Sequence, residues 1–189
     1  DDIYKPCDNL ALLVTLNANG TIDKKVVASL AAAWKCDSSF ADDWTKFKNA
    51  FANKSLQMVT FTITEKGYAL GRGTDYFPFV QSDFAAGPEG TLNSMMSKIT
   101  ALMYHRYLTG KGKIALCSTD NCSHNGEKLQ NAVMTIANTW VEKGFCKKDF
   151  ISYLNTDVSF PWSMIDKITP RPDASVTKML EADGFADTK

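Results

Sequence analysis

Strand-like stretches alternate along this sequence with amphipathic helical stretches, and this alternation limits the possible folds more than any other feature. Residues 58–64 are rich in β-branched side chains, and residues 113–118 form a short apolar run, so we expect two strands. Residues 92–108 and 127–143 carry apolar side chains three and four positions apart, which predicts helices with one buried face. Strands that alternate with helices predict an α/β layered domain with a mainly parallel sheet, whose ligands bind at the carboxyl ends of the strands.

The remaining segments fit the same class. Leu10 to Leu16 is apolar on both faces and stops at the turn residues 17–20, so we expect a buried strand, central in the sheet, followed by a hairpin-like reversal. Asp42 or Asp43 can cap a helix that carries three aromatic residues on one face. The rest of the sequence predicts a strand over 21–28, a long loop over 70–90 with a short helix near 80–85, and helices over 147–154 and 174–182.

Size, charge and cysteine usage exclude several classes of function. A chain of 189 residues favours one domain, and 21 basic side chains balance 21 acidic ones, so nucleic acid is a poor first candidate for a partner. No apolar run approaches the roughly 20 residues that cross a bilayer, so we expect no membrane association. The five scattered cysteines predict free thiols in a reducing cytoplasm, and with only two histidines we expect no metal site.

The polar loop from Ser118 to Gly126 is the first candidate site. It follows a predicted strand and opens a helix, so free backbone N–H groups and side-chain donors converge there and can bind a ribose, a phosphate or a carbonyl oxygen. The alternative from composition is structural: Asp120 or Ser123 caps the helix, and the asparagines satisfy the backbone of the turn.

Two further candidates follow apolar segments. Asp166 and Lys167 come directly after the segment that contains Trp162, and a carboxylate there could bind sugar hydroxyls; the alternative is a surface ion pair at a bend of the chain. Thr64 and Glu65 end the strand over 58–64, and the alternative for Glu65 is a solvated turn residue.

Together, these three segments resemble the mannitol dehydrogenases and their relatives, the fructuronate and tagaturonate reductases. The matching stretches, in order and at near-family spacing, are Thr60 to Tyr68, Ser118 to Gly126, and Phe160 to Pro170. The last is the most specific, although the family usually has valine and arginine where this chain has Ile165 and Lys167. A lysine keeps the charge but cannot form the forked contact with a carboxylate that arginine forms.

The resemblance implies a Rossmann-like three-layer domain, incomplete here, of an oxidoreductase that transfers hydride between NAD and the carbonyl of a ketose or keto-uronate, with no metal. NADP is not excluded as the cofactor. Asn121 would hydrogen-bond the reacting oxygen. The other carried-over roles are cofactor contacts for Thr64, Glu65, Asp120 and Asn121, and substrate contacts for Asn125, Asp166 and Lys167. The substrate would be a sugar alcohol, a ketose or a uronate.

The resemblance also implies parts that this chain does not carry. No G-x-G-x-x-G turn for the cofactor phosphates occurs in the sequence, and the family's lysine base belongs to a second, helical domain. We therefore expect residues 1–189 to be a partial NAD(P)-binding domain that is inactive alone and has the remainder of its own chain as a partner. Two rival hypotheses stay open: a non-enzymatic α/β module that binds a sugar or nucleotide, and an enzyme with Cys122 as nucleophile and His124 as base.

Overall fold

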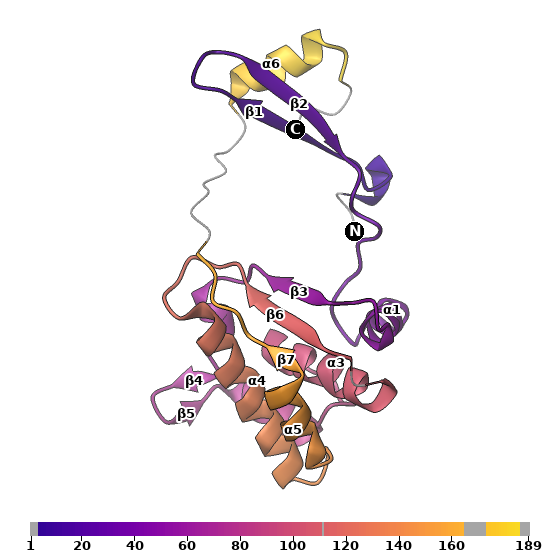
Figure 1. Cartoon of the computed structure of the whole chain (residues 1–189), viewed down its shortest axis with the longest axis vertical. Helices are drawn as coiled ribbons and strands as arrows, with labels where there is room; N and C mark the ends of the chain where they lie inside the picture. The colour runs from indigo at the N-terminus through magenta and orange to yellow at the C-terminus, as the bar shows by residue number, and fades with distance from the viewer. Residues whose placement is uncertain (1–3, 111, 165–172, 186–189) are drawn as a thin grey trace.

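A short parallel sheet forms the centre of the computed structural model, which describes residues 4–110, 112–164 and 173–185. Its strands are β3 (Met58–Phe61), β6 (Ile114–Ser118) and β7 (Val158–Ser159), in the order β3-β6-β7 (Figure 1). Met58 pairs with Ala115 and Ile114 pairs with Val158, so all three strands run in the same direction. The α/β class with a parallel sheet, predicted from the alternation of strands and helices, is confirmed.

Most of the helices begin and end within a few residues of the predicted bounds. They are α1 (Ala41–Ala52), α2 (Pro78–Ala86), α3 (Met95–Thr109), α4 (Asn125–Glu142), α5 (Asp149–Thr156) and α6 (Ala174–Ala182), with short 3-10 helices η1 (Lys5–Cys7) and η2 (Glu65–Tyr68). The predicted long loop over 70–90 contains α2 and a small antiparallel pair, β4 (Gly71–Arg72) with β5 (Asp75–Tyr76). Residues 28–34, whose composition suits a helix or irregular structure after the predicted strand over 21–28, contain neither a helix nor a strand.

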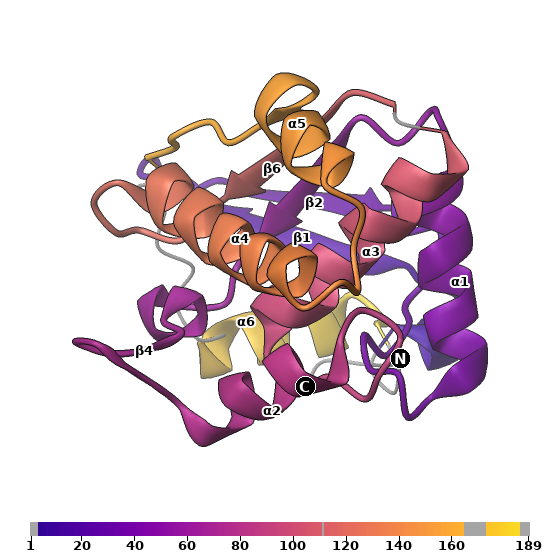
Figure 2. The ribbon, with the colours of Figure 1, turned by 90° about the horizontal axis from the view of Figure 1, so that it is seen from below.

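The predicted apolar stripes of α3 and α4 form the core. The two helices pack against each other, and α4 also packs on β6 (Figure 2). Side chains with almost no exposed surface come from all three elements: Met96, Leu102 and Met103 of α3, Leu116 of β6, and Leu129, Ile136 and Trp140 of α4. This burial fixes where β6 ends, and therefore where the polar loop after it begins.

The N-terminal hairpin corrects one prediction. Strands β1 (Ala11–Leu16) and β2 (Ile22–Val27) pair antiparallel around the predicted turn and form a sheet of their own, drawn with α6 away from the parallel sheet in Figure 1. The hairpin reversal is confirmed, but the prediction of a buried central strand is wrong. Leu13 and Leu16 are 52% and 58% exposed, because among the described residues β1 pairs only with β2.

Candidate functional site

The polar loops after β3 and β6 lie side by side at the carboxyl edge of the sheet. The two strands are parallel neighbours in register, with Phe61 opposite Ser118. The pairing continues one residue further, where the backbone N–H of Thr119 donates to the carbonyl of Phe61 at 2.8 Å, and the hydroxyls of Thr62 and Thr119 are 2.7 Å apart. This edge is where α/β sheets bind their ligands, so two of the three predicted site segments are brought together at the expected place.

The carboxylate of Asp120 joins the two loops. One oxygen accepts the backbone N–H of Thr64 at 2.9 Å, and the other accepts the N–H of Ile63 at 3.0 Å and the hydroxyl of Tyr68. Asp120 is only 7% exposed. Burial alone would raise the pKa of this carboxyl group, but the hydrogen bonds from Ile63, Tyr68 and Thr64 outweigh it and hold the pKa below its ordinary value. Asp120 is therefore a charged anchor whose known partners all lie within the protein.

Thr64 has an unusual backbone conformation at this anchor. Its φ of 64° and ψ of 158° fall in a region that glycine adopts easily and a β-branched residue rarely adopts. Such a conformation costs about 1–3 kcal/mol and persists only where surrounding contacts impose it. The bond from Thr64 N–H to Asp120, with the bond from Gly67 N–H to the Thr64 carbonyl at 2.9 Å, supplies those contacts.

Tyr68, which the sequence analysis did not single out, completes the anchor. Its ring is 4% exposed, and its hydroxyl lies 2.8 Å from the hydroxyl of the fully buried Ser118 as well as against Asp120. Burial, and then the hydrogen bond to Asp120, raise the pKa of the Tyr68 hydroxyl well above its ordinary value, so it stays a protonated donor. The sequence signal was weak: Tyr68 ends the resemblance segment Thr60 to Tyr68, but an aromatic residue after a strand is usually a core residue.

Asn125 fastens a third segment to the same edge. Its amide N–H₂ donates to the carbonyls of Ser163 at 2.8 Å and Asp120 at 3.0 Å, and its amide oxygen accepts the N–H of Ser163 at 3.1 Å and of Gly126 at 2.8 Å. The following residue must be glycine for this contact, because a Cβ on Gly126 would lie 2.6 Å from the carbonyl oxygen of Phe160. The segment Phe160 to Ser163 is thereby held against the start of α4.

The predicted helix caps at α4 are wrong. The N-cap position is occupied by His124, with a left-handed φ of 55°, and no side chain caps the helix. The carboxylate of Asp120 is bonded to the other loop instead. His124 lies with its ring 4.6 Å from that of Trp162, and among the described residues it makes no hydrogen bond to Cys122. The geometry therefore does not support a Cys122–His124 nucleophile and base.

Asn121 and Glu65 are among the exposed residues of the two joined loops. Asn121 follows the anchor residue Asp120 directly, and within the described part of the chain its side-chain amide makes no hydrogen bond. Glu65 follows Thr64 and forms an ion pair with Lys128 of α4, in which the carboxylate is 65% exposed. Glu65 is thus a solvated residue at the start of η2 with a basic partner. Its predicted contact with a cofactor remains a prediction.

The remaining features that the sequence analysis considered are Asp166 and Lys167, metal-binding groups, membrane-spanning helices and the cysteines. Asp166 and Lys167 lie outside the described residues. No group of histidine, cysteine and acidic side chains that could hold a metal occurs over 4–110, 112–164 and 173–185. Over the same ranges no helix is long and apolar enough to span a bilayer. None of the five cysteines, all of which lie in the described ranges, forms a disulfide.

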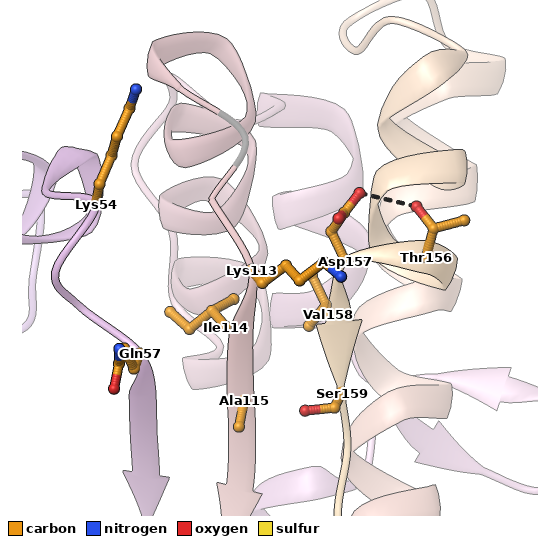
Figure 3. A pocket seen from close by; sticks show the side chains of 9 residues that line it. All are labelled: Lys54, Gln57, Lys113, Ile114, Ala115, Thr156, Asp157, Val158 and Ser159. Atoms are coloured by element: carbon orange, nitrogen blue, oxygen red, sulfur yellow. Dashed lines mark hydrogen bonds between the residues drawn. The ribbon is translucent and has the colours of Figure 1, made fainter.

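An open hollow of about 570 Å³ lies at the opposite, amino end of the strands (Figure 3). Its lining comes from the starts of all three strands and the segments before them: Lys54, Gln57, Lys113, Ile114, Ala115, Thr156, Asp157, Val158 and Ser159. None of the predicted site residues that lie in the described ranges borders it. The hollow is therefore separate from the joined loops, which lie at the far end of β3 and β6.

A parallel α/β sheet with polar loops at its carboxyl edge is the arrangement of the Rossmann class of domains. The family model described as the mannitol dehydrogenase Rossmann domain matches residues 8–186. The chain therefore belongs to the mannitol dehydrogenase family, as the three sequence segments predicted.

Individual relatives agree with this assignment. D-mannonate oxidoreductase of Thermotoga maritima is 46% identical over 186 residues, which are 98% of this chain and 34% of that protein. Mannitol 2-dehydrogenase of Pyrenophora tritici-repentis is 28% identical, over 90% of this chain and 29% of that protein. The structure of Pseudomonas fluorescens mannitol 2-dehydrogenase with NAD and D-mannitol shares the fold, with a TM-score of 0.77 at 23% identity over 96% of this chain and 35% of that one. The chain thus spans about a third of the length of the relatives it matches.

Proposed function

We propose that this chain is the cofactor-side part of an NAD-dependent oxidoreductase of carbohydrate metabolism, which transfers hydride between NAD(H) and the carbonyl or secondary alcohol of a sugar derivative. Membership of the mannitol dehydrogenase family supports the class of reaction. The observation that carries the proposal is the junction of the two loops through Asp120, since it brings Asn121 and Glu65 to one edge with Asn121 exposed.

The first candidate substrate pair is a keto-uronate and its hydroxy acid. The relative at 46% identity is named for D-mannonate, whereas relatives named for mannitol and arabinitol match at 25–29% identity. The sequence segments 118–126 and 160–170 also resemble the uronate reductases slightly more than the polyol dehydrogenases. A ketose and its polyol are the second candidate.

Asn121 would act on the reacting oxygen. Bound NAD(H) supplies or accepts the hydride, while the amide of Asn121 donates a hydrogen bond to the oxygen on which negative charge develops. An amide held next to a buried anchor needs little reorganisation to do this, which is the basis of electrostatic stabilisation in active sites. Glu65 would lie near the proton path, and Asp166 and Lys167 would contact substrate hydroxyls. The base that exchanges the substrate proton would come from outside this chain.

The residues present fit the nicotinamide end of the cofactor rather than its phosphates. Exposed donors and acceptors at the carboxyl edge (Thr64, Glu65 and Asn121) suit a ribose and a carboxamide, with Asp120 predicted beside them. No glycine-rich phosphate turn occurs in the sequence. NADP remains a second candidate, because one relative is named a polyol:NADP oxidoreductase. We further propose that residues 1–189 act as a partial NAD(P)-binding domain whose partner is a second, helical domain of the same protein. Its location would be the cytoplasm, where thiols such as those of Cys36 and Cys146 stay reduced.

The test is steady-state turnover of the full-length protein with NAD and D-mannonate, followed by NADH absorbance, with mannitol as the comparison substrate. Asn121→Ala should lower kcat by about a hundredfold, the usual effect of losing one donor to a developing oxyanion. Asn131→Ala, an exposed asparagine on α4, is the matched control and should leave kcat unchanged. Equal turnover of Asn121→Ala and wild type would remove Asn121 from the mechanism.

A binding module without catalysis is the second candidate function. It corresponds to the alternative that the sequence left open, an α/β module that binds a sugar or nucleotide at the carboxyl edge of the sheet. A fluorescence titration of the chain with NADH, beside the turnover assay, separates the two. Saturable binding of NADH or sugar without turnover in the full-length protein would favour the module. Turnover with either substrate class would exclude it.

A further inference from the structure

We propose that Asp120, Tyr68 and Ser118 form a clamp that fixes the position of Asn121 relative to Glu65, with Tyr68 as a positioning residue for the reaction. The inference rests on the function proposed above. It also changes the role of Asp120, from a contact with the cofactor to the anchor of the two loops that carry the contacts.

The clamp connects the residues that directly precede each candidate group. Asp120 precedes Asn121, and its two carboxylate oxygens hold the backbone N–H groups of Ile63 and Thr64 at 3.0 and 2.9 Å. Thr64 precedes Glu65. Any change in these two bonds therefore moves the backbone that carries Asn121 against the backbone that carries Glu65. The two residues are 56 positions apart in sequence, so this contact between neighbouring loops is what sets their spacing.

The hydrogen bonds around Tyr68 form a closed ring with one consistent direction. The Tyr68 hydroxyl donates its only hydrogen to the Asp120 carboxylate, so at the 2.8 Å contact Ser118 must donate to the Tyr68 oxygen. The Ser118 oxygen in turn accepts the backbone N–H of Asp120 at 3.3 Å. Because Ser118 ends β6 and is fully buried, the ring ties the anchor to the rigid sheet.

The conformation of Thr64 shows that the clamp constrains the loop. Without the acceptor at Asp120, nothing else in the described structure bonds the Thr64 N–H, and a threonine at φ 64° relaxes toward the ordinary β region. That rotation would redirect Glu65 and η2, which carries Tyr68. A clamp that holds a strained residue beside exposed functional groups is a means of preorganising a site.

The experiment compares Tyr68→Phe and Asp120→Asn with two controls in the full-length protein. Tyr76→Phe removes a hydroxyl from a 43% exposed tyrosine. Asp83→Asn alters another fully buried carboxylate, which accepts the N–H groups of Asn93 and Ser94 at 2.8 Å, far in sequence from both loops. Asp83→Asn therefore reports what loss of stability alone does. The readouts are kcat, KM for NADH, and hydrogen exchange of the Ile63 and Thr64 amides.

We expect Tyr68→Phe to lower kcat about tenfold and Asp120→Asn about a hundredfold, since a displacement of about 1 Å in a reacting group has effects of this size. KM for NADH should change less than about twofold, and exchange at Thr64 should accelerate about tenfold or more. The controls should keep the wild-type kcat and Thr64 exchange rate.

Two results would overturn the clamp. One is wild-type kcat and wild-type Thr64 exchange in Tyr68→Phe. The other is a raised KM for NADH with unchanged kcat in Asp120→Asn, which would make Asp120 a direct cofactor ligand. If the wild-type protein turns over neither class of substrate, the proposed function fails. Hydrogen exchange of the Thr64 amide then tests the clamp independently of activity. Faster exchange in both Tyr68→Phe and Asp120→Asn supports the clamp, and unchanged exchange rejects it.

Discussion

The two ends of the parallel sheet are each held by one buried charged side chain of opposite sign. At the amino end, Arg106 of α3 is 1% exposed and donates to backbone carbonyls before β3 and β6: Phe51 at 2.7 Å, Asn53 at 2.9 Å, Leu56 at 2.9 Å and Gly112 at 3.0 Å. At the carboxyl end, the carboxylate of Asp120 accepts hydrogen bonds from two backbone N–H groups and one hydroxyl. In both cases one charged side chain supplies hydrogen bonds to backbone groups that have no partner in a helix or strand.

The difference between the ends lies in what the fastened loops present to solvent. The loops around Arg106 carry none of the residues predicted to act in chemistry. The loops around Asp120 present Asn121 and Glu65, both exposed. A buried charged side chain by itself therefore indicates only that a loop is held in place. A functional site is indicated where exposed polar side chains lie next to that charged side chain.

The largest effect on stability is expected from removing the guanidinium of Arg106, which holds the amino end of the sheet. Arg106→Met should lower the free energy of unfolding by about 3–5 kcal/mol, because one buried carbonyl and several partly buried ones lose their donor together. Urea unfolding followed by circular dichroism measures the change. Arg72→Met, on the exposed strand β4, is the matched control and should unfold like wild type. A loss below about 1 kcal/mol for Arg106→Met would mean that water replaces the guanidinium and that the amino end is not fastened by it.

The carboxyl end offers the next largest effect at Asn125. Asn125→Ala removes the donor and the acceptor of an amide that bridges α4 and Ser163. It should cost about 2–4 kcal/mol of unfolding free energy, since the bond to Asp120 is buried and those to Ser163 are partly buried. Asn155→Ala, exposed on α5, is the control in the same urea titration. An unchanged stability with weakened substrate binding would instead favour the role in substrate contact that the sequence resemblance implies for Asn125.

Sequence patterns predicted the sheet and the helices better than the loop contacts. The stripes of α3 and α4 are set by spacing along one segment, and they proved to be the core. The prediction that the first strand of the hairpin is buried was wrong. A run such as Leu10 to Leu16 shows that both faces are apolar, but it does not show what covers them. Asp120 was assigned as a cap or a cofactor contact because its true partners, Ile63, Thr64 and Tyr68, are more than 50 positions away, and no local pattern reveals such bonds.

A smaller effect is expected where a third segment meets these loops. Gly126→Ala places a methyl group within 2.7 Å of the carbonyl oxygens of Phe160 and Pro161, which are backbone atoms and yield little. The better helix propensity of alanine offsets part of this, so the net loss should be about 1–3 kcal/mol. Thermal unfolding measures it. The control is Gly144→Ala, which meets no atom within 4 Å but has a φ of 78°, and therefore reports backbone strain without the contact. A stabilised Gly126→Ala would show that segment 160–163 moves freely away from α4.

The smallest expected effect is a change in how steeply the unfolding free energy falls with pH in acid. It tests the negative charge of Asp120, on which the comparison of the two ends of the sheet depends. A carboxyl group with a lowered folded-state pKa stabilises the fold above its unfolded pKa, and this stabilisation is lost as pH falls through the folded value. For Asp120 the lowered pKa places that loss below about pH 4. Other carboxyl groups, Asp37 among them, also have lowered pKa values, so the difference between wild type and Asp120→Asn isolates Asp120. The unfolding free energy of wild type should fall more steeply than that of Asp120→Asn between about pH 4 and pH 2, while Asp149→Asn, exposed on α5, should follow wild type. Parallel curves for wild type and Asp120→Asn would mean that the carboxyl end is held by a neutral group, and that only Arg106 fastens its end of the sheet by charge.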